Sequence, residues 1–306
     1  MTEIFEDLRP LLFSIAYRMI GRVAEAEDIV QEAFLRYHRA LAEDHAEIDS
    51  PKAYLSAVTT RLAIDHLRSA RVRKETYVGE WLPEPLLTDE HTVDAAERTD
   101  DDDSLSMAFL LLLERLSPVE RAVFLLHDVF DYAYDEVAHI VGKSVENTRQ
   151  LAVRARRHVD ENRPRFDASR EQREALADRF FSAVGGGRME DLLNALAADV
   201  VVYGDNGGTR PSWPRPIYGR DKVLPLLLGL GKHARDLDVT IARTEINGQP
   251  GARFIAPDGR LMYVMTVDIS DGVVQTVRSV INPDKLSHLG PLADVRAMLH
   301  AQQEHR

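Results

Sequence analysis

The segment that most constrains this chain is 51–75, PKAYLSAVTTRLAIDHLRSARVRKE, which predicts a long amphipathic helix with a basic end. Its apolar residues recur at steps of three and four, and Ser50 followed by Pro51 provides an N-cap and a proline at the first helical position. One face is therefore expected to be buried. The opposite face and the tail carry the charged residues Arg61, Asp65, Arg68, Arg71, Arg73 and Lys74. This mostly cationic surface suits a polyanionic partner, although an ordinary solvated face is the alternative.

The preceding segment, 24–40, predicts a second amphipathic helix with an unusual outward side. Its apolar residues form an inward stripe, as in a helix that covers a core. The outward side is formed by Asp28, Gln31, Glu32 and Leu35. A leucine exposed among acids indicates a docking face for another protein rather than a catalytic site.

Residues from about Ser104 onward predict a second helical unit that ends in a helix-turn-helix. Gly142 separates a short helix at 134–141 from a longer one, which Ser144 caps and which runs to about Asp160. In this pattern the second helix enters the major groove of DNA. The residues on its outward face are Arg149, Gln150, Val153, Arg154, Arg156 and Arg157.

These helical stretches resemble a known family. AEDIVQEAFLRYHRA together with SPKAYLSAVTTRLAIDHLRSARVRKE is similar to region 2 of bacterial RNA polymerase sigma factors of the extracytoplasmic-function class (group IV). YDEVAHIVGKSVENTRQLAVRARRHV resembles region 4 of the same class. The resemblance implies an alternative sigma factor that binds core RNA polymerase, through the coiled coil of its largest subunit and the flap, and directs transcription initiation at promoter DNA.

The same resemblance implies a role for each exposed set of residues. The polymerase-binding residues would be Asp28, Gln31, Glu32 and Leu35. The residues that read and open the −10 element would be Arg61, Asp65, Arg68, Arg71, Arg73 and Lys74. The residues at the −35 element would be Ser144, Arg149, Gln150, Val153, Arg154, Arg156 and Arg157, the last two nearer phosphates than base edges.

A third domain is expected after 162–167, because Pro164 breaks the helix and the periodicity later changes from 3.6 to 2. Helices are predicted at 171–184 and 191–197, and a short strand at 200–203. The pairs Asn247–Gly248, Asp258–Gly259 and Asp271–Gly272 are typical of tight hairpins, so 237–246, 252–256, 260–269 and 273–281 are expected to form an antiparallel meander. The α+β layering resembles the SnoaL-like polyketide-cyclase fold, a cone whose sheet encloses a pocket.

Enzymes of that fold use a carboxylate or an Asp–His pair as general base. Candidates in this chain are Tyr203, Asp205, Trp213, His233 and Asp268, but no spacing brings any two of them together. We therefore expect no catalytic residue and no cofactor or metal. An isomerase or cyclase joined to a DNA-binding module is the alternative, and a sensor for an unidentified small ligand in the C-terminal pocket is a third possibility.

Two proline-containing motifs resemble one branch of these sigma factors, the mycobacterial sigma-J type, which has such a C-terminal extension. WLPEP begins with Trp81, Leu82 and Pro83, and NPDKL comprises Asn282, Pro283, Asp284, Lys285 and Leu286. The branch also carries a DGGGK-type loop, which here reads DNGGT from Asp205, so the basic end of the loop is lost or displaced to Arg210. The resemblance implies that Asp205 and the residues of the two motifs are interdomain regulatory residues. We expect Trp81 to dock near 282–286, so that the C-terminal domain tunes activity in cis; a tryptophan that merely covers its own domain is the alternative.

The 306 residues are expected to form region 2 at 1–76, a linker at 77–103, region 4 at 104–163 and the SnoaL-like regulatory domain at 167–306. The absence of cysteine excludes disulfides, thiolate nucleophiles and cysteine-based zinc sites. No long apolar run occurs and the N-terminus carries acids, so a soluble cytoplasmic protein without a membrane partner is expected. The net charge of −12 is concentrated in acids of the linker, which predicts weak or masked affinity for free DNA.

Overall fold

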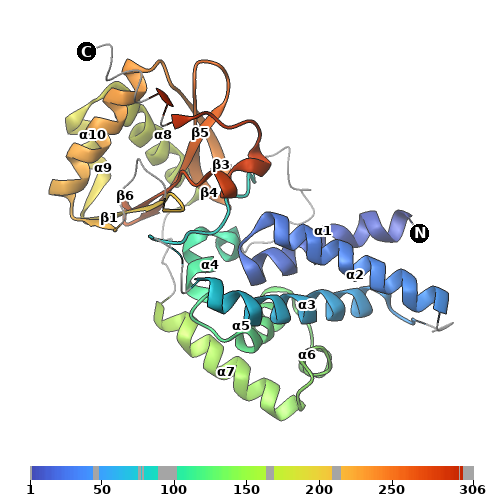
Figure 1. The fold of residues 1–306 in the computed structure, drawn as a ribbon. Coiled ribbons are helices and arrows are strands. Elements are labelled where there is room, and N and C mark those ends of the chain that lie inside the picture. The colour runs from blue at the N-terminus through green and yellow to red at the C-terminus, as the bar shows by residue number, and fades with distance from the viewer. Residues whose placement is uncertain are drawn as a thin grey trace. The chain divides into compact units, whose positions relative to one another are not determined.

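The computed structural model describes residues 2–43, 48–74, 77, 79–88, 102–162, 169–208, 215–295 and 297–298. The chain forms two compact units (Figure 1). The helical unit comprises Met1–Thr76 and Phe109–Arg163, and the sheet unit comprises Tyr77–Ala108 and Pro164–Arg306. Region 2 and most of region 4, as expected from the sequence, thus share one unit. The whole expected linker at 77–103 and the first five residues of the expected region 4 belong to the sheet unit.

The helical unit begins with a bundle of three helices, each of which packs against the other two. Its members are α1 (Thr2–Ile20), α2 (Val23–Glu43) and α3 (Pro51–Lys74). Leu12, Tyr17 and Leu55 are fully buried in it. The bundle therefore presents its polar helix faces outward, as the apolar periodicity predicts.

The second part of the helical unit contains the predicted helix-turn-helix. Its elements are α4 (Met107–Leu113), α5 (Pro118–Phe124), a π-helical turn (Leu125–Val129), α6 (Tyr134–Val141) and α7 (Val145–Asn162). Ser117 and Glu120 form a reciprocal capping box at the start of α5, because each side chain bonds the other residue's backbone N–H. α7 packs on both α5 and α6. Gly142 ends α6 with φ 65°, a left-handed conformation that glycine adopts without strain.

The sheet unit is a six-stranded sheet with helices on one face. The strand order is β2-β1-β6-β5-β4-β3, with β1 parallel to β6 and the other pairs antiparallel. The strands are β1 (Leu196–Asp205), β2 (Ile217–Tyr218), β3 (Thr240–Ile246), β4 (Gln249–Ile255), β5 (Leu261–Ser270) and β6 (Val273–Val280). The meander from β3 to β6 and the α+β fold class are as the sequence predicts.

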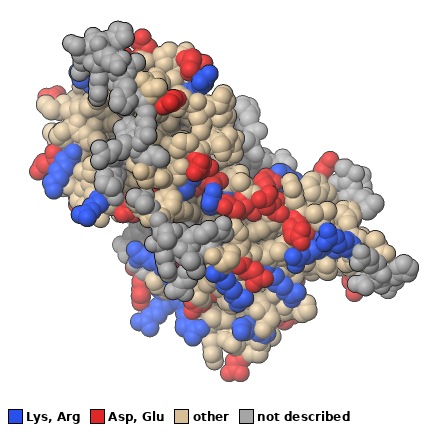
Figure 2. Space-filling model, viewed as in Figure 1, with Lys and Arg blue, Asp and Glu red and all other residues tan. Residues whose placement is uncertain are grey.

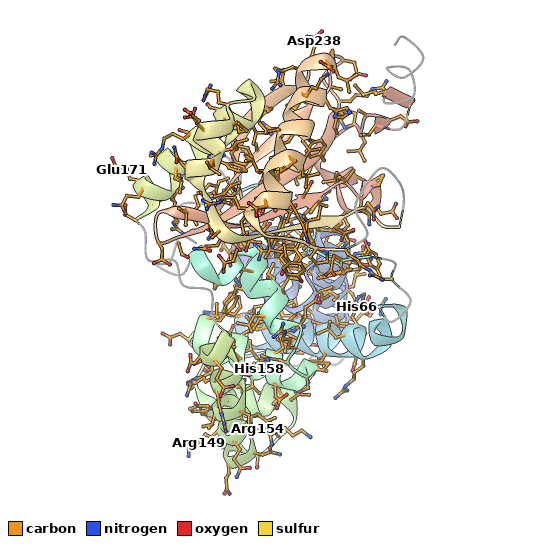
Figure 3. The ribbon with its side chains drawn as sticks, turned by 90° about the vertical axis from the view of Figure 1, so that its left-hand side faces the viewer. His66, Arg149, Arg154, His158, Glu171 and Asp238 are labelled. Carbon is orange, nitrogen blue, oxygen red and sulfur yellow. The ribbon has the colours of Figure 1, made fainter. Side chains whose placement is uncertain are left out.

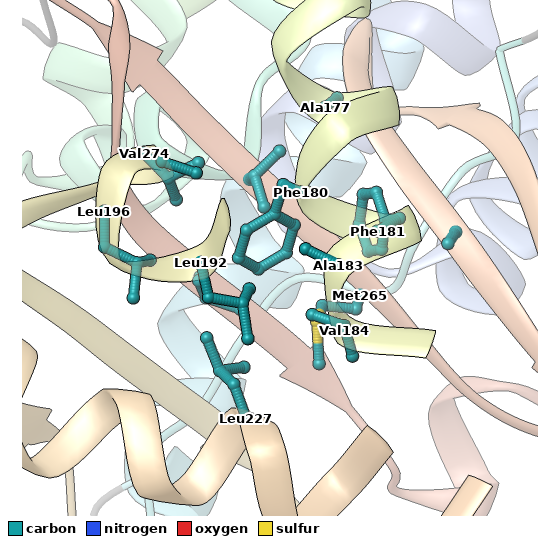
Figure 4. Close-up of a cluster of buried hydrophobic side chains, with 14 of the residues drawn as sticks. Ala177, Phe180, Phe181, Ala183, Val184, Leu192, Leu196, Leu227, Met265 and Val274 are labelled. Atoms are coloured by element: carbon teal, nitrogen blue, oxygen red, sulfur yellow. The ribbon is translucent and has the colours of Figure 1, made fainter. Parts of the chain in front are cut away.

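Helices α8 (Arg170–Gly186), α9 (Met189–Ala195) and α10 (Arg220–Asp236) supply the core on the covered face. Figure 4 shows Phe180 of α8 among Leu192, Leu227 and Met265, and all four side chains are fully buried. α9 begins and ends two residues earlier than expected, and the following strand is longer than expected, since the chain changes from helix to strand at Leu196. These buried apolar side chains form a core between the helices and the sheet.

The sequence did not predict α10, because Pro225, Gly229 and Gly231 interrupt its pattern. The structure gives the reason for one of these glycines. A Cβ added at Gly231 would lie 1.9 Å from the carbonyl oxygen of Val184, so this residue allows α10 to approach α8 closely. Burial of Val223 and Leu227 stabilises the helix despite its poor propensity.

Candidate polymerase, promoter and linker-binding sites

The candidate polymerase-binding face lies on α2. Leu35 has 51% of its surface exposed, and Asp28 and Gln31 are exposed beside it. Glu32 accepts a hydrogen bond from Arg36 at 2.8 Å, and this bond lowers the pKa of the Glu32 carboxyl. The face can therefore offer an apolar contact surrounded by negative charge.

The candidate −10 residues on α3 are not all equally free. Asp65 and Arg68 form an exposed ion pair at 3.3 Å. Arg61 instead donates from Nε to the carbonyl of Ile140 and from Nη2 to that of His139, both at 2.9 Å. The remaining three predicted residues form the last turn of α3, and their side chains lie outside the described ones: Arg71, Arg73 and Lys74.

The reading helix α7 begins where the sequence predicts. The Ser144 hydroxyl accepts a hydrogen bond from the backbone N–H of Asn147 at 3.2 Å, which caps the helix. Thr148 and Ala152 are fully buried on its inner face, whereas Val153 is 61% exposed and Gln150 is exposed. The inner and outer faces of α7 therefore match the predicted ones.

Four arginines of α7 have partners inside the helical unit. Arg149 lies 5.5 Å from the ring centre of Tyr134, and Arg154 pairs with Glu120 at 3.3 Å. Figure 3 labels both arginines on α7, and Figure 2 shows acids interspersed among the basic side chains of this unit. The remaining two are Arg156, which pairs with Asp128, and Arg157, which pairs with Glu161. These four side chains are therefore engaged within the helical unit.

The contact with Asp128 distinguishes Arg156 from the other arginines. A hydrogen bond from Arg156 to the Asp128 carboxylate raises the pKa of the guanidinium. Its side chain is also less exposed than those of Arg154 and Arg157. Arg156 therefore connects α7 to the π-helical turn after α5. The sequence predicted only an outward-facing side chain at this position.

Two buried polar residues, Arg121 and Tyr132, also connect the predicted regions 2 and 4 by hydrogen bonds that were not predicted from the sequence. Buried Arg121 donates to the carbonyls of Leu113 at 2.9 Å and Met19 at 2.5 Å, and desolvation lowers its pKa to about 10. The Ser56 hydroxyl bonds the Tyr132 hydroxyl at 2.7 Å, also in a buried position. An arginine placed beside a run of core residues is the one signal that sequence offered.

Within the sheet unit, the first linker motif lies against the second proline motif. Lys285, 3% exposed at its side chain, pairs with fully buried Asp205 at 2.6 Å and donates to the carbonyl of Leu82 at 2.5 Å. Its Nζ lies 4.2 Å from the ring centre of Trp81. The Asp205 carboxylate also accepts from the Leu82 N–H at 2.8 Å. We call the group of Tyr77, Trp81, Leu82, Asp205, Asn282 and Lys285 the linker clasp.

Tyr77 and Asn282 complete the linker clasp. The Tyr77 hydroxyl donates to Asp205, and the Asn282 side-chain amide donates to the Tyr77 oxygen at 3.0 Å. Desolvation and then the bond to Asp205 raise the pKa of Tyr77. Asn282 also caps the short 3-10 turn at Pro283–Lys285, with Asp284 N–H as donor, and Leu286 is buried beside it.

The altered DNGGT loop packs directly on this group. Gly207 has φ 61°, and a Cβ there would lie 2.7 Å from the Asn282 amide, so a side chain cannot be accommodated without movement. Its N–H donates to Asp205 at 3.1 Å. The loop thus positions the carboxylate, while its end at Thr209 lies outside the described residues.

The rest of the described linker follows the sheet. His288 bonds the carbonyl of Pro85 at 2.8 Å, and Leu87 forms a bridge with Ile246 at the edge of β3. The buried side chain of Asn247 accepts from the Leu86 N–H at 3.0 Å and donates to the carbonyl of Leu105 at 3.2 Å. The Asn247–Gly248 pair, predicted only as a hairpin turn, therefore also holds Leu86 of the linker and Leu105, two residues beyond the expected end of the linker.

The described catalytic candidates lie in separate places, except that Tyr203 and Asp268 both contact Arg278. Val202, Val267 and Val277 point to the apolar core, so by strand alternation Tyr203, Asp205, Asp268 and Arg278 lie on the opposite face. On that face Asp268 pairs with Arg278, and Asp205 belongs to the linker clasp. His233 is exposed and bonds the carbonyl of Gly229, while Trp213 lies outside the described residues.

A groove of about 540 Å³ opens between α8, the end of α10 and β3. Phe181 and Ile241 give it an apolar wall, and Arg235 and Arg243 give it charge. Arg243 is already bonded to Glu174 and Asp178. No group of three potential metal ligands occurs among the described residues. The described helices also include none that is long and apolar enough to cross a membrane.

Comparison with known proteins identifies two families of domain within the helical stretches of the chain. The family model for Sigma-70 region 2 matches residues 4–73, and the model for Sigma-70, region 4 matches residues 106–159. The two matches define the class of protein as a sigma factor that binds core RNA polymerase and promoter DNA. The helix-turn-helix is its region 4.

Full-length relatives specify the family. The chain is 35% identical to the ECF RNA polymerase sigma factor SigJ of Mycobacterium tuberculosis, over 98% of this chain and 97% of that protein. It is 32% identical to the probable ECF RNA polymerase sigma factor SigI of the same species, over 92% and 93% of the two chains. The crystal structure of SigJ matches with a TM-score of 0.75 and 34% identity, over 96% of this chain and all of that one. The chain belongs to the extracytoplasmic-function sigma factors.

Proposed function

We propose that the C-terminal domain of this alternative sigma factor regulates transcription initiation in cis by holding the linker between regions 2 and 4. The observation that carries the proposal is the linker clasp, in which Lys285 and Asp205 enclose the backbone of Leu82 under the Trp81 ring. In a sigma factor the linker joins the −10 reader to the −35 reader. A domain that fixes the linker therefore restricts how far apart these readers can reach.

The domain is proposed to tune activity rather than to switch it on or off. Burial of one indole contributes a few kcal/mol at most. A contact of that size changes the equilibrium between a docked and a released linker, but it leaves both states populated. Regulation of this kind needs no separate inhibitor protein.

The proposed contacts with polymerase and DNA follow the exposed sets on α2, α3 and α7. Leu35, with Asp28, Gln31 and Glu32, would contact the coiled coil of the largest polymerase subunit, and region 4 would contact the flap. Arg149, Gln150, Val153 and Arg154 would face −35 base edges. Support comes from their exposure on the outer helix faces.

Run-off transcription with purified core polymerase tests the proposal. The full chain is expected to direct transcripts from a cognate promoter, and Trp81→Ala is expected to change their yield severalfold without abolishing them. Equal yields from both proteins at every concentration would contradict regulation through the linker. Absence of transcripts with the unaltered chain would contradict the sigma role itself.

A further inference from the structure

Arg149 is held differently from the other arginines on the outer face of α7. Among the described residues Arg149 forms no ion pair, and its guanidinium carbon lies 5.5 Å from the ring centre of Tyr134, the first residue of α6. The other three arginines each pair with an acid: Arg154, Arg156 and Arg157. A cation at this distance from an aromatic ring is attracted by the negative charge of the ring face. The ring therefore restricts where the exposed side chain of Arg149 lies.

The Tyr134 side chain is itself held in place by its neighbours. The centre of the His127 ring lies 3.9 Å from the centre of the Tyr134 ring, and Tyr134 packs on the apolar cluster that includes Val137. The hydrogen bond from Arg156 to Asp128, and to a smaller extent one to the Tyr134 hydroxyl, raises the pKa of the Arg156 guanidinium. Tyr134 thus contacts α7 through its ring and through its hydroxyl.

The backbone before α6 explains why the rings of His127 and Tyr134 meet. His127 lies in the π-helical turn, and π-helical turns are rare and frequent at functional sites. Asp131 follows in a left-handed conformation with φ 62°, which aspartate tolerates better than most residues. His127 Nδ1 donates to the carbonyl of Tyr132 at 2.7 Å, two residues before Tyr134. This hydrogen bond closes the loop and fixes the two rings beside each other.

A contact with a ring holds an arginine without occupying its hydrogen-bond donors. An ion pair uses guanidinium N–H groups, which DNA binds only after the acid has been displaced. A ring face attracts the cation as a whole, so the N–H fork remains available for O6 and N7 of a guanine. Arg149 lies in the first half of α7, and the N-terminal residues of the second helix contact base edges in helix-turn-helix proteins.

We propose that Tyr134 is a positioning residue for recognition of the −35 element. Its ring fixes the guanidinium of Arg149 before DNA binds, so less side-chain freedom is lost in the complex. Arg154 is paired with Glu120 instead and provides an internal comparison. This inference rests on the proposed −35 role of Arg149.

Holoenzyme binding to promoters in which each −35 base pair is substituted in turn tests the proposal. Tyr134→Leu keeps an apolar side chain but removes the ring. It is expected to lower preference about two- to fivefold at the base pair where Arg149→Ala lowers it, and to leave preference unchanged at the base pair read by Arg154. Tyr134→Phe retains the ring face and is expected to recover the preference. Tyr134→Leu combined with Arg149→Ala is expected to lower preference no further than Arg149→Ala alone.

A second replacement at position 134 separates positioning from folding. Pentafluorophenylalanine has nearly the shape of phenylalanine, but its fluorine atoms remove the negative charge of the ring face. The variant is expected to melt at the same temperature as Tyr134→Phe and to lose preference as Tyr134→Leu does. Equal preference with both aromatic side chains, or a loss that is uniform across all −35 sequences, would overturn the proposal and make Tyr134 a packing residue.

Arg149→Ala distinguishes failure of this inference from failure of the proposed function. If Arg149→Ala relaxes preference at one base pair while Tyr134→Leu relaxes none, Arg149 reads DNA without Tyr134 and the inference alone fails. If Arg149→Ala relaxes no base pair in a holoenzyme that still produces run-off transcripts, the −35 role of Arg149 fails together with the inference, and the sigma role stands.

Discussion

Lys285 shows how much a single residue can depend on its surroundings. Its ammonium is almost completely removed from water and is balanced by Asp205, the Leu82 carbonyl and the Trp81 ring. Removing one member of a buried ion pair typically costs 3–5 kcal/mol, because the other charge stays buried without compensation. An exposed pair contributes little by comparison.

Lys285→Met is therefore expected to lower the free energy of unfolding by about 3–5 kcal/mol, as measured by urea denaturation. Arg260→Gln is the matched control, because Arg260 and its partner Asp258 are both more than half exposed. The control is expected to lose less than about 1 kcal/mol. Equal losses in the two variants would contradict the assignment of Lys285 as the centre of the linker clasp.

Arg149 and Arg154 carry the second prediction at this scale. Each alanine substitution is expected to cost about 1–3 kcal/mol of promoter affinity and to relax preference at one −35 base pair, since a guanidinium recognises base edges. The measurement is holoenzyme binding to a series of −35 variants. Arg179→Ala, which removes an exposed cation on α8, is the control and should leave binding unchanged. A loss that is uniform across all −35 sequences would make these residues phosphate contacts instead.

At the scale of elements, α2 shows how one helix serves two purposes. Its inner face includes Ala26, Val30 and Ala33, all buried in the helical bundle. Its outer face leaves Leu35 exposed without a structural need. A substitution on the outer face of α2 can therefore change docking without changing the stability of the fold.

Leu35→Arg is expected to leave the melting temperature nearly unchanged and to abolish co-elution with core polymerase, because an exposed anchor adds little to folding. Leu41→Arg provides the control, since Leu41 is a second exposed leucine on α2 and is six residues further along the helix. Co-elution should persist with the control. Retained co-elution of Leu35→Arg would rule out this face as the docking site.

Elements differed in how well the sequence predicted them. The regular periodicity of segment 51–75 and the cap at Ser144 predicted α3 and α7 closely, because local pattern and tertiary burial agree there. α10 was missed because its glycines and proline oppose a helix locally. Tertiary packing against α8 outweighs that opposition, and no local pattern contains it.

At the scale of the whole molecule, the linker clasp joins residues about 200 positions apart in the chain: Leu82 and Lys285 are separated by 203 residues. A coupled pair of this kind makes the effects of two substitutions non-additive. Run-off yields are to be measured for Trp81→Ala and Lys285→Met, alone and together. The coupling free energy calculated from the ratios of these yields is expected to be about 0.5–2 kcal/mol, the range of a partly desolvated cation–π contact. Strictly additive effects would show that the two proline motifs do not communicate in transcription.

The sequence by itself determined the features that depend on local pattern. These are the helical periodicity of the two sigma regions, the turn before the reading helix, the hairpin turns of the meander and the outward faces of α2 and α7. Motif resemblance added the family, which the relatives confirm. Each of these signals spans fewer than about 25 residues, so neighbouring side chains suffice to specify it.

Only the tertiary structure decided which of the polar residues form hydrogen bonds or ion pairs within the protein. Arg61 looks like a free cation in the sequence but caps α6. Asp205 was a candidate both for catalysis and for interdomain regulation, and it pairs with Lys285. The sequence predicted no contact for Tyr77 and only a hairpin turn for Asn247, although both residues hold the linker to the sheet. The physical reason is that a buried polar group must find partners wherever the fold brings them, and those partners lie far away in the chain.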